Sequence, residues 1–178
     1  MQKILVVVDM QNDFIDGALG TAEAQAIVGN VVRKIESYQG EPVFATRDTH
    51  KENYMETSEG RHLPVPHCIK GTKGWEIREE VAQALNRAGA RIIDKPTFGS
   101  ETLAETLFEL ASGKDEAPEI ELVGLCTDIC VVSNALLLKA RMPEAQIRVD
   151  ASCTAGVTPK SHEAALLTMR MCQVDVIG

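Results

Sequence analysis

Apolar residues follow two different spacings that alternate along the chain. Residues 3–9 form a continuous β-branched run, which is typical of a strand buried on both faces of a parallel sheet. Residues 21–38 repeat their apolar positions with helical spacing, and Gly40 and Pro42 mark the change to the next strand. By these criteria, strands are predicted at 3–9, 42–46, 90–94, 119–124, 146–150 and 173–177, and helices at 21–38, 75–88, 101–111, 131–140 and 159–171. Six strands alternating with five helices predict a doubly wound α/β fold.

A long polar loop, residues 51–73, interrupts this pattern. Loops of this length inside a compact domain are usually functional or disordered. Pro64, Pro66 and Trp75 supply rigid or aromatic anchors, which favours an ordered and therefore functional loop.

Size and charge limit the classes of function. The chain has 178 residues, enough for a single domain at 1–178 with a full core, and a formal net charge of −8. That charge argues against nucleic acid and membrane surfaces as partners, since both are polyanions. No apolar run approaches the length of a membrane span, and no secretory signal precedes the first strand. Five scattered cysteines without a CxxC spacing favour free thiols in a reducing cytoplasm, and the absence of glycine-rich phosphate-binding motifs argues against a nucleotide cofactor.

The segment after the strand at 119–124 turns sharply into an apolar helix. Thr127 and Asp128 are suitable N-cap residues, which places Cys130 in the first helical turn. Backbone N–H groups and the helix dipole there favour a thiolate, and the same N–H groups can hold a developing oxyanion. The alternative is a cysteine buried in a core helix, the common role of a free cysteine.

Three ionisable side chains are expected at the carboxyl edge of the sheet, where ligands of open α/β folds bind. Asp9 ends the first strand, Lys95 follows the third, and Cys130 follows the fourth. A thiol nucleophile needs a group that accepts its proton and a cation that stabilises the thiolate, and Asp9 and Lys95 suit these two tasks. Asp9 alone has a competing interpretation as the cap of the next turn.

A second group of polar side chains follows the strand at 42–46. Asp48 and His50 lie two residues apart, and the long loop adds His67, with Glu59 as a further acidic candidate. Carboxylate and imidazole ligands suit zinc, iron or manganese and leave positions open for water or substrate. These side chains are therefore candidate ligands of a divalent metal, zinc before iron or manganese, but Asp and His residues in a polar loop are more often simply solvated. His162 is interpreted as structural.

Three blocks of sequence resemble the signatures of the isochorismatase-like cysteine hydrolases, in the order found in that family. They are Val-Asp-Met-Gln-Asn-Asp-Phe at 8–14, Asp-Lys-Pro-Thr-Phe-Gly-Ser at 94–100 and Gly-Leu-Cys-Thr-Asp-Ile-Cys-Val at 124–131. The resemblance covers essentially the whole chain. It implies that Asp9, Lys95 and Cys130 form a catalytic triad, and that the fold is a three-layer sandwich around a six-stranded parallel sheet.

Within this family the chain resembles the nicotinamidase/pyrazinamidase subgroup, which carries a metal site beside the triad. The resemblance implies that Asp48, His50 and His67 are metal ligands, and Glu59 resembles a further acidic ligand of some members. Phe14 resembles the aromatic residue that stacks on the pyridine ring of the substrate.

The resemblance also implies a reaction, the conversion of nicotinamide to nicotinate and ammonia in NAD salvage. The amide would pass through a thioester on Cys130 while the metal positions the pyridine ring. The backbone N–H groups of Cys126 and Cys130 would form the oxyanion hole, aided by a cis peptide between Leu125 and Cys126. Pro64 stands where some relatives have a substrate-packing tryptophan, which leaves the identity of the small-molecule amide open. Relatives are often dimers or tetramers, so a homo-oligomer is expected.

Other functions stay open at this point. The same triad can hydrolyse a different small amide, carbamoyl or ureido compound, and isochorismatase activity is known on this fold. A catalytically silent binding protein is disfavoured because every member of the triad is present. A redox protein using Cys126 and Cys130 is disfavoured as well, because their spacing straddles a strand-to-helix turn and makes good disulfide geometry hard to reach.

Overall fold

Strands and helices alternate over residues 2–178, the part of the chain that this computed structural model describes. The strands are β1 (Lys3–Val8), β2 (Val43–Asp48), β3 (Arg91–Lys95), β4 (Glu119–Leu125), β5 (Gln146–Ala155) and β6 (Asp175–Ile177). The α-helices are α1 (Asn12–Ile15), α2 (Ala22–Ser37), α3 (Ser58–His62), α4 (Glu79–Arg87), α5 (Glu101–Ala111), α6 (Val132–Arg141) and α7 (Pro159–Met171). A 3₁₀ turn, η1 (Tyr54–Glu56), precedes α3, and a π-helical turn, η2 (Thr127–Val131), precedes α6. Among the residues described, no helix combines the length and apolarity needed to cross a membrane.

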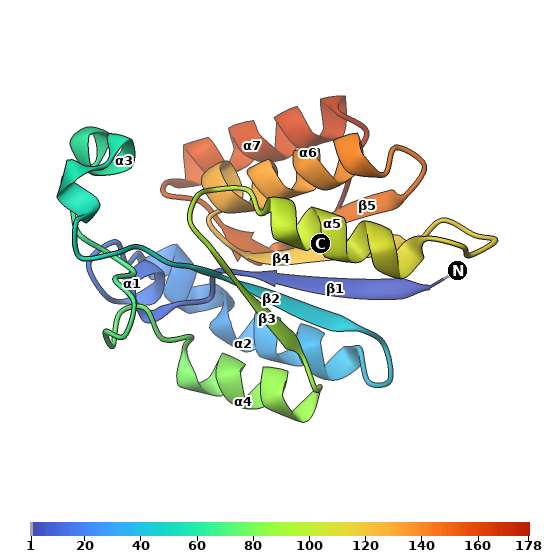
Figure 1. Ribbon diagram of the computed structural model, residues 1–178, viewed down its shortest axis with the longest axis horizontal. Helices are drawn as coiled ribbons and strands as arrows, with labels where there is room; N and C mark the ends of the chain where they lie inside the picture. The colour runs from blue at the N-terminus through green and yellow to red at the C-terminus, as the bar shows by residue number, and fades with distance from the viewer. Residues whose placement is uncertain (1) are drawn as a thin grey trace.

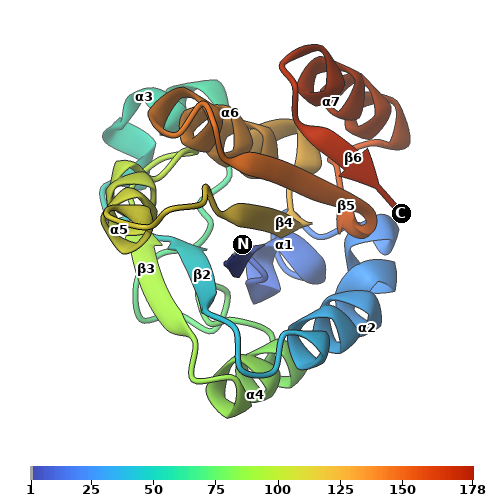
Figure 2. The same ribbon diagram turned by 90° about the vertical axis from the view of Figure 1, so that its right-hand side faces the viewer.

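The six strands form one parallel sheet in the order β3-β2-β1-β4-β5-β6. Figure 1 shows α5, α6 and α7 on one face of the sheet and α2 and α4 on the other, and Figure 2 shows the same layers after a quarter turn. The chain winds from β1 to β3 in one direction and from β4 to β6 in the other, so the order reverses between β1 and β4. The predicted doubly wound sandwich with a six-stranded parallel sheet is confirmed. Ligands of such sheets bind at the carboxyl ends of the strands beside this reversal.

Alternating side chains of the central strands fill two apolar layers. In β1, Ile4, Val6 and Val8 pack beneath α5, α6 and α7, whereas Leu5 and Val7 pack beneath α2 and α4. All five are at most 1% exposed. A strand buried on both faces needs the unbroken apolar run that the sequence provides. The two layers hold the strands in place, so that their carboxyl ends lie at one edge of the sheet.

Tertiary contacts shorten the helix predicted at 75–88. The segment before α4 pairs with the chain that leaves β1, and Gln11 and Ile77 form an isolated antiparallel bridge. The Asn12 N–H donates to the Glu76 carbonyl at 3.0 Å, and the Arg78 N–H donates to the Met10 carbonyl at 2.8 Å. These bonds use the backbone groups that a helix would need, so α4 starts only at residue 79.

The bounds of other elements also differ from those that their periodicity predicts. The strand predicted at 42–46 continues through Arg47 and Asp48, because both pair with β3. The strand predicted at 146–150 continues to Ala155, and that predicted at 173–177 begins only at Asp175. The loop at 51–73 is ordered and contains η1 and α3, whereas α5 and α7 span the predicted residues.

The ammonium of Lys34 on α2 links two carboxylates of the sheet. Lys34 Nζ lies 2.6 Å from Glu121 Oε1 and 2.7 Å from Asp150 Oδ2, and the two acidic side chains are 6% and 7% exposed. Burial opposes ionisation of Asp150, but hydrogen bonds led by that of Lys34 outweigh it and lower its pKa below the ordinary 3.8. Burial also opposes the charge of Lys34, yet its two carboxylate partners raise its pKa above the ordinary 10.5.

Lys34→Met is therefore expected to lower the free energy of unfolding by about 2 kcal/mol at neutral pH, because two buried carboxylates lose their cation. The folded-state pKa of Asp150 is lowered, so its contribution to stability is present above pH 3.8 and is lost as the pH falls through that folded-state pKa. The folded-state pKa of Lys34 is raised, so its contribution is present below pH 10.5 and is lost as the pH rises through that folded-state pKa. Urea unfolding at neutral and acidic pH should show the difference between the two proteins shrinking in acid. Lys160→Met on the exposed start of α7 is the control, with a change below about 0.5 kcal/mol. An equal stability of wild type and Lys34→Met at neutral pH would contradict this prediction.

Candidate active site

Asp9, Lys95 and Cys130 meet at the carboxyl edge of the sheet. Asp9 follows β1, Lys95 ends β3, and Cys130 lies in η2 beyond β4. Lys95 Nζ lies 2.7 Å from Asp9 Oδ2 and 3.4 Å from Cys130 Sγ. The Thr46 hydroxyl donates to the other Asp9 oxygen at 2.7 Å, and the Thr97 carbonyl accepts from Lys95 at 3.0 Å. The predicted grouping is therefore present, with the ammonium in contact with both the carboxylate and the thiol.

Burial dominates the electrostatics of these groups, since Asp9 is 0% exposed, Lys95 1% and Cys130 4%. Burial raises the pKa of the Asp9 carboxyl, and the neighbouring ammonium offsets only part of this effect. Burial opposes the charge of Lys95, but the adjacent Asp9 and Cys130 outweigh it and raise its pKa. Burial and the Asp9 carboxylate raise the pKa of the Cys130 thiol well above its ordinary 9.0. Burial of the thiol therefore works against the thiolate that was expected at the start of a helix.

The turn that carries the thiol differs from the predicted start of a helix. The residue before its first turn is Cys126, not Thr127 or Asp128, and no side chain caps it. The Thr127 hydroxyl is hydrogen bonded to His162 Nδ1 at 2.8 Å, and the Asp128 carboxylate accepts from the Val157 N–H at 3.1 Å. Both side chains therefore hold η2 against the start of α7, which agrees with the structural interpretation of His162.

A buried asparagine fixes the same turn from the other side. The Asn134 amide donates to the Cys130 carbonyl at 2.8 Å and accepts from the Ser100 N–H at 2.9 Å. Asn134 thus ties the thiol-bearing turn to the start of α5, the helix that follows Lys95. The peptide bond between Leu125 and Cys126 is cis, as the family resemblance implied.

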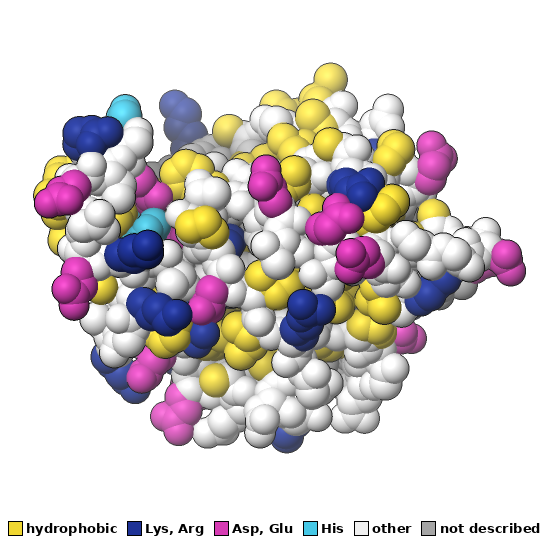
Figure 3. All heavy atoms as spheres, viewed as in Figure 1, with side chains coloured by type: hydrophobic (Ala, Val, Ile, Leu, Met, Phe, Trp, Pro, Cys, Tyr) yellow, Lys and Arg dark blue, Asp and Glu magenta, His cyan; other side chains and the backbone are white. Residues whose placement is uncertain are grey.

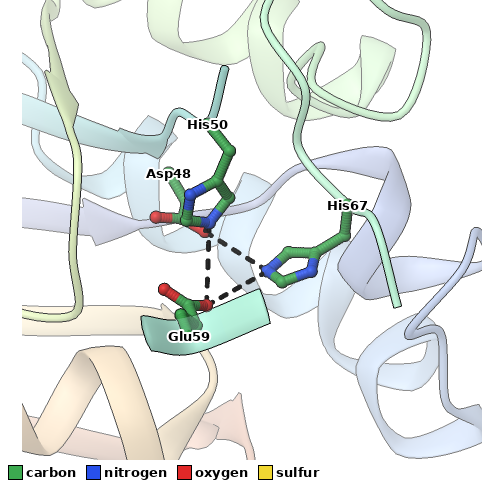
Figure 4. A group of neighbouring side chains, drawn as sticks. All are labelled: Asp48, His50, Glu59 and His67. Carbon is green, nitrogen blue, oxygen red and sulfur yellow. Dashed lines mark hydrogen bonds and ion pairs between the residues drawn. The ribbon is translucent and has the colours of Figure 1, made fainter. Parts of the chain in front are cut away.

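Asp48, His50, Glu59 and His67 form a second cluster (Figure 4). Asp48 ends β2, Glu59 lies on α3, and the two histidines lie on the loops that follow these elements. One ligand atom from each side chain lies within 4.8 Å of all the others. Asp48 Oδ2 is 2.9 Å from His50 Nε2 and 3.6 Å from His67 Nε2, and Glu59 Oε1 is 3.5 Å from His67 Nε2. The structure brings together all four candidate metal ligands, including Glu59.

The chemistry of this cluster fits a divalent cation. His67 Nδ1 lies 2.8 Å from the Val65 carbonyl, which only accepts, so Nδ1 donates and Nε2 faces the carboxylates. Burial opposes a charge on His67, but hydrogen bonds to Asp48 and Glu59 outweigh it and raise its pKa to about 10. Burial likewise opposes ionisation of Asp48, yet hydrogen bonds from the two histidines lower its pKa. The cluster therefore favours positive charge at its centre, and two carboxylates with two imidazoles suit zinc, iron or manganese.

Asp48 connects the second cluster to the first. Its Oδ2 faces the imidazoles of His50 and His67, whereas its Oδ1 lies 3.4 Å from Lys95 Nζ. Asp48 and Lys95 are register partners on the adjacent strands β2 and β3, so their side chains leave the same face of the sheet. One ammonium therefore contacts a carboxylate of each cluster, and the two groups form a single site.

A cavity of about 520 Å³ opens over this site. Cys130, Asp48, Glu59 and His67 all line it, so the thiol and the candidate metal ligands face the same space. Phe14 lines it too, with its ring centroid 5.5 Å from that of His67. The outer wall comes from α3, which stands away from the layers of the fold in Figure 1 and at the left edge of the molecule in Figure 3. The volume is that of a pocket for a small organic molecule.

Sequence reasoning did not identify the apolar wall of the cavity or the Thr46 hydroxyl that donates to Asp9. Leu19, Leu63, Phe98 and Ile129 line the cavity, but nothing in their spacing separates them from core residues. Leu63, the residue before Pro64, places an aliphatic side chain in this wall. Thr46 carried a weak signal, since it is a hydroxyl residue in an otherwise apolar strand.

A buried thiol in contact with an ammonium and a carboxylate, and open to a cavity, is what a cysteine-dependent hydrolase requires and what a core cysteine does not. Comparison with known protein families agrees with this class. The chain belongs to the isochorismatase domain family, whose match spans residues 3–178. The resemblance to the isochorismatase-like cysteine hydrolases is thereby confirmed.

Three similar proteins match this chain along nearly their whole length. The nicotinamidase/pyrazinamidase of Mycobacterium tuberculosis is 28% identical over 196 aligned positions, which cover 98% of each protein. The crystal structure of a nicotinamidase/pyrazinamidase from Bacillus subtilis is 27% identical and superposes with a TM-score of 0.86 over 100% of both chains. The crystal structure of a pyrazinamidase from Pyrococcus horikoshii in complex with zinc is 27% identical, with a TM-score of 0.79 over 99% of both chains.

Proposed function

We propose that this protein is a metal-assisted cysteine amidohydrolase that converts nicotinamide to nicotinate and ammonia. The observation that carries the proposal is the position of Asp48, which contacts both Lys95 and the imidazoles and so sets a metal-binding cluster beside a thiol in one cavity. Nicotinamide has a ring nitrogen that can coordinate a metal and a carboxamide that a thiol can attack, and therefore uses both parts of such a site. The similarity to proteins named as nicotinamidases and pyrazinamidases supports the same substrate class.

Cys130 is the proposed nucleophile and Asp9 the proposed general base. Because burial raises the pKa of both groups, the thiol keeps its proton until the base accepts it. Asp9 takes this proton as the sulfur attacks the carboxamide carbon and the carbonyl oxygen becomes an oxyanion. The ammonium of Lys95, 2.7 Å from the carboxylate and 3.4 Å from the sulfur, stabilises negative charge on either atom. The backbone N–H groups of Cys126 and Cys130 are the proposed donors to the oxyanion.

The same base serves the second half of the reaction. Asp9 gives its proton to the leaving nitrogen, the C–N bond breaks, and ammonia departs from a thioester on Cys130. A water molecule then attacks the thioester carbon while Asp9 accepts one of its protons. The C–S bond breaks and the sulfur regains a proton from Asp9. The product leaves as the carboxylic acid, which loses its remaining proton to solvent and becomes nicotinate. Each proton that Asp9 takes up is returned, so the site ends the cycle as it began.

The proposed metal ligands are Asp48, His50, Glu59 and His67, with zinc favoured over iron or manganese. When bound, the metal supplies a coordination position for the ring nitrogen of the substrate. Phe14, on the cavity wall, is the proposed stacking partner of the ring.

The alternative of a different amide, carbamoyl or ureido substrate on the same triad is less well supported. Such a reaction has no need for four metal-ligating side chains within 4.8 Å of one another beside the thiol. Isochorismatase, binding and redox functions leave the same cluster without a role.

Removal of the metal is the test of the proposal. Treatment with a chelator is expected to lower kcat/KM for nicotinamide by about 100-fold, or ~3 kcal/mol, because the amide is no longer oriented toward the thiol. Ammonia release measures this, and returning zinc, iron or manganese in turn identifies the metal. His50→Ala and Glu59→Ala should behave like the chelated protein, whereas Glu52→Ala, an exposed acidic residue of the same loop, should not. Full activity without metal, or ammonia release from ureido compounds but not from nicotinamide, would overturn the proposal.

A homo-oligomer is expected. Light scattering on the purified protein measures its mass and so tests this prediction.

A cytoplasmic location is expected from the free thiols. Fractionation of cells that express the protein tests this prediction.

A further inference from the structure

The segment that follows β1 contacts both parts of the metal-binding cluster, and the proposed mechanism gives this segment no role beyond Phe14. Gln11 and Asp13 follow Asp9, the proposed base, in the sequence, and neither side chain lines the substrate cavity. Each instead makes hydrogen bonds with the backbone of a different ligand-bearing segment. These bonds determine where the ligands stand.

Gln11 fixes the backbone of Asp48. Its side chain is 0% exposed, and its Oε1 accepts from the Asp48 N–H at 2.7 Å. Its Nε2 donates to the Asp48 carbonyl at 2.8 Å and to the Trp75 carbonyl at 2.9 Å. An amide is required here, because the contact needs an acceptor and a donor at one position. The carboxylate of Asp48 is thus held at the point where it faces the imidazoles on one side and the triad ammonium on the other.

Asp13 fixes the loop that carries His67. Its Oδ2 accepts from the Cys68 N–H at 2.8 Å, and the Cys68 carbonyl accepts from the His50 N–H at 2.9 Å. Cys68 has a φ of 47°, in the left-handed region that a side chain rarely adopts, so its backbone needs such support. A Cβ at Gly74 would overlap the Asp13 carboxylate, which explains the glycine at that position.

We infer that Gln11 and Asp13 are positioning residues for the metal, acting through Asp48 and His67 respectively. Groups that orient metal ligands by hydrogen bonds commonly change metal affinity by 10–100-fold when removed, about the same factor that we expect here. The inference rests on metal binding in the proposed function but does not depend on the substrate. It also assigns a purpose to Gln11 and Asp13, two polar residues that follow Asp9 in the block at 8–14.

Zinc affinity of the full-length, metal-free protein tests the inference. Competition with a chromogenic chelator should show the dissociation constant for Zn²⁺ rising about 10–100-fold in Asp13→Ala and in Gln11→Met. Asp13→Asn keeps an oxygen that can accept from Cys68 and should restore affinity to within about threefold of wild type. Asn12→Ala is the matched control, because Asn12 lies between the two residues but donates to the Lys73 carbonyl, outside the cluster.

Two further measurements separate positioning from general stability. The rate at which iodoacetamide alkylates Cys130 in metal-free Asp13→Ala should match wild type, because the Asp13 carboxylate accepts from the Cys68 and Ala18 N–H groups and not from a member of the triad. Unchanged zinc affinity in Asp13→Ala or Gln11→Met, even with a lowered unfolding temperature, would overturn the inference and leave only a structural role. If Asp13→Ala does not fold, the zinc affinity of Gln11→Met still tests the inference. The wild-type protein could fail to hydrolyse nicotinamide while the two variants still bind zinc more weakly than wild type. That result would overturn the proposed reaction and support the inference.

Discussion

Cys130→Ala is expected to abolish ammonia release from nicotinamide, with a loss of at least about 10⁴-fold in kcat. The substitution removes the atom that would form the thioester, and it leaves Asp9 without a thiol proton to accept. Water alone in the cavity is a poor substitute, because the proposed base and ammonium are placed around the sulfur, 3.4 Å from Lys95. A steady-state ammonia assay measures the loss, and a urea unfolding curve establishes that the variant is folded.

Cys126→Ala is the matched control. Cys126 lines the same cavity, but burial raises its pKa to about 12 and only its backbone N–H has a proposed role. The backbone N–H survives the substitution, so we expect activity within a few-fold of wild type. Activity retained in Cys130→Ala and lost in Cys126→Ala would move the nucleophile to Cys126.

The triad followed from the sequence because its members are placed by strand ends. Asp9, Lys95 and Cys130 each come after an apolar run, and parallel strands deliver their carboxyl ends to one edge of a sheet. The spacing of apolar residues along a strand or helix is a local property of the sequence. A strand end predicted from it can be wrong by a residue or two and still place its side chain at this edge. The roles of these residues stay predictions, whereas their meeting at one edge is observed.

The contact that unites the two clusters did not follow from the sequence. Asp48 was expected beyond a strand at 42–46, but β2 continues through it and pairs it in register with Lys95. Register between strands that are 47 residues apart depends on the packing of the whole sheet, not on the pattern of either strand. The candidate ligand Glu59 raised the same difficulty. The direction of its side chain depends on α3, a short helix in a segment whose sequence showed only the composition of a polar loop.

The pKa of Cys130 shows where a local argument fails. The start of a helix favours a thiolate through its dipole and its free N–H groups. In the structure the thiol is buried among residues from several strands and helices, and this burial is the largest cause that raises its pKa. The sequence identifies the residue, but the protonation state depends on how much water the complete fold excludes.

Lys95→Met is expected to have the largest combined effect on stability and activity. Lys95 Nζ contacts Asp9 at 2.7 Å and Asp48 at 3.4 Å in a site that is almost fully buried. Asp48 keeps its contacts with His50 and His67, whereas Asp9 loses its cation. We expect a loss of about 3–5 kcal/mol in the free energy of unfolding at neutral pH. A fall of about 10³-fold in kcat should accompany it, because nothing then stabilises the thiolate. Urea unfolding and ammonia release measure the two effects.

The dependence of the stability loss on pH identifies its cause. Without the ammonium, the pKa of Asp9, already raised by burial, rises further above 3.8, so the folded state keeps a proton that the unfolded state releases. The loss should therefore be smallest near pH 4 and grow as the pH rises. Lys95→Met combined with Asp9→Asn removes the buried unpaired carboxylate and should recover much of the stability while activity stays lost. A stability loss that is independent of pH, or activity that returns with stability in the double variant, would mean that Lys95 acts by packing and not by its charge.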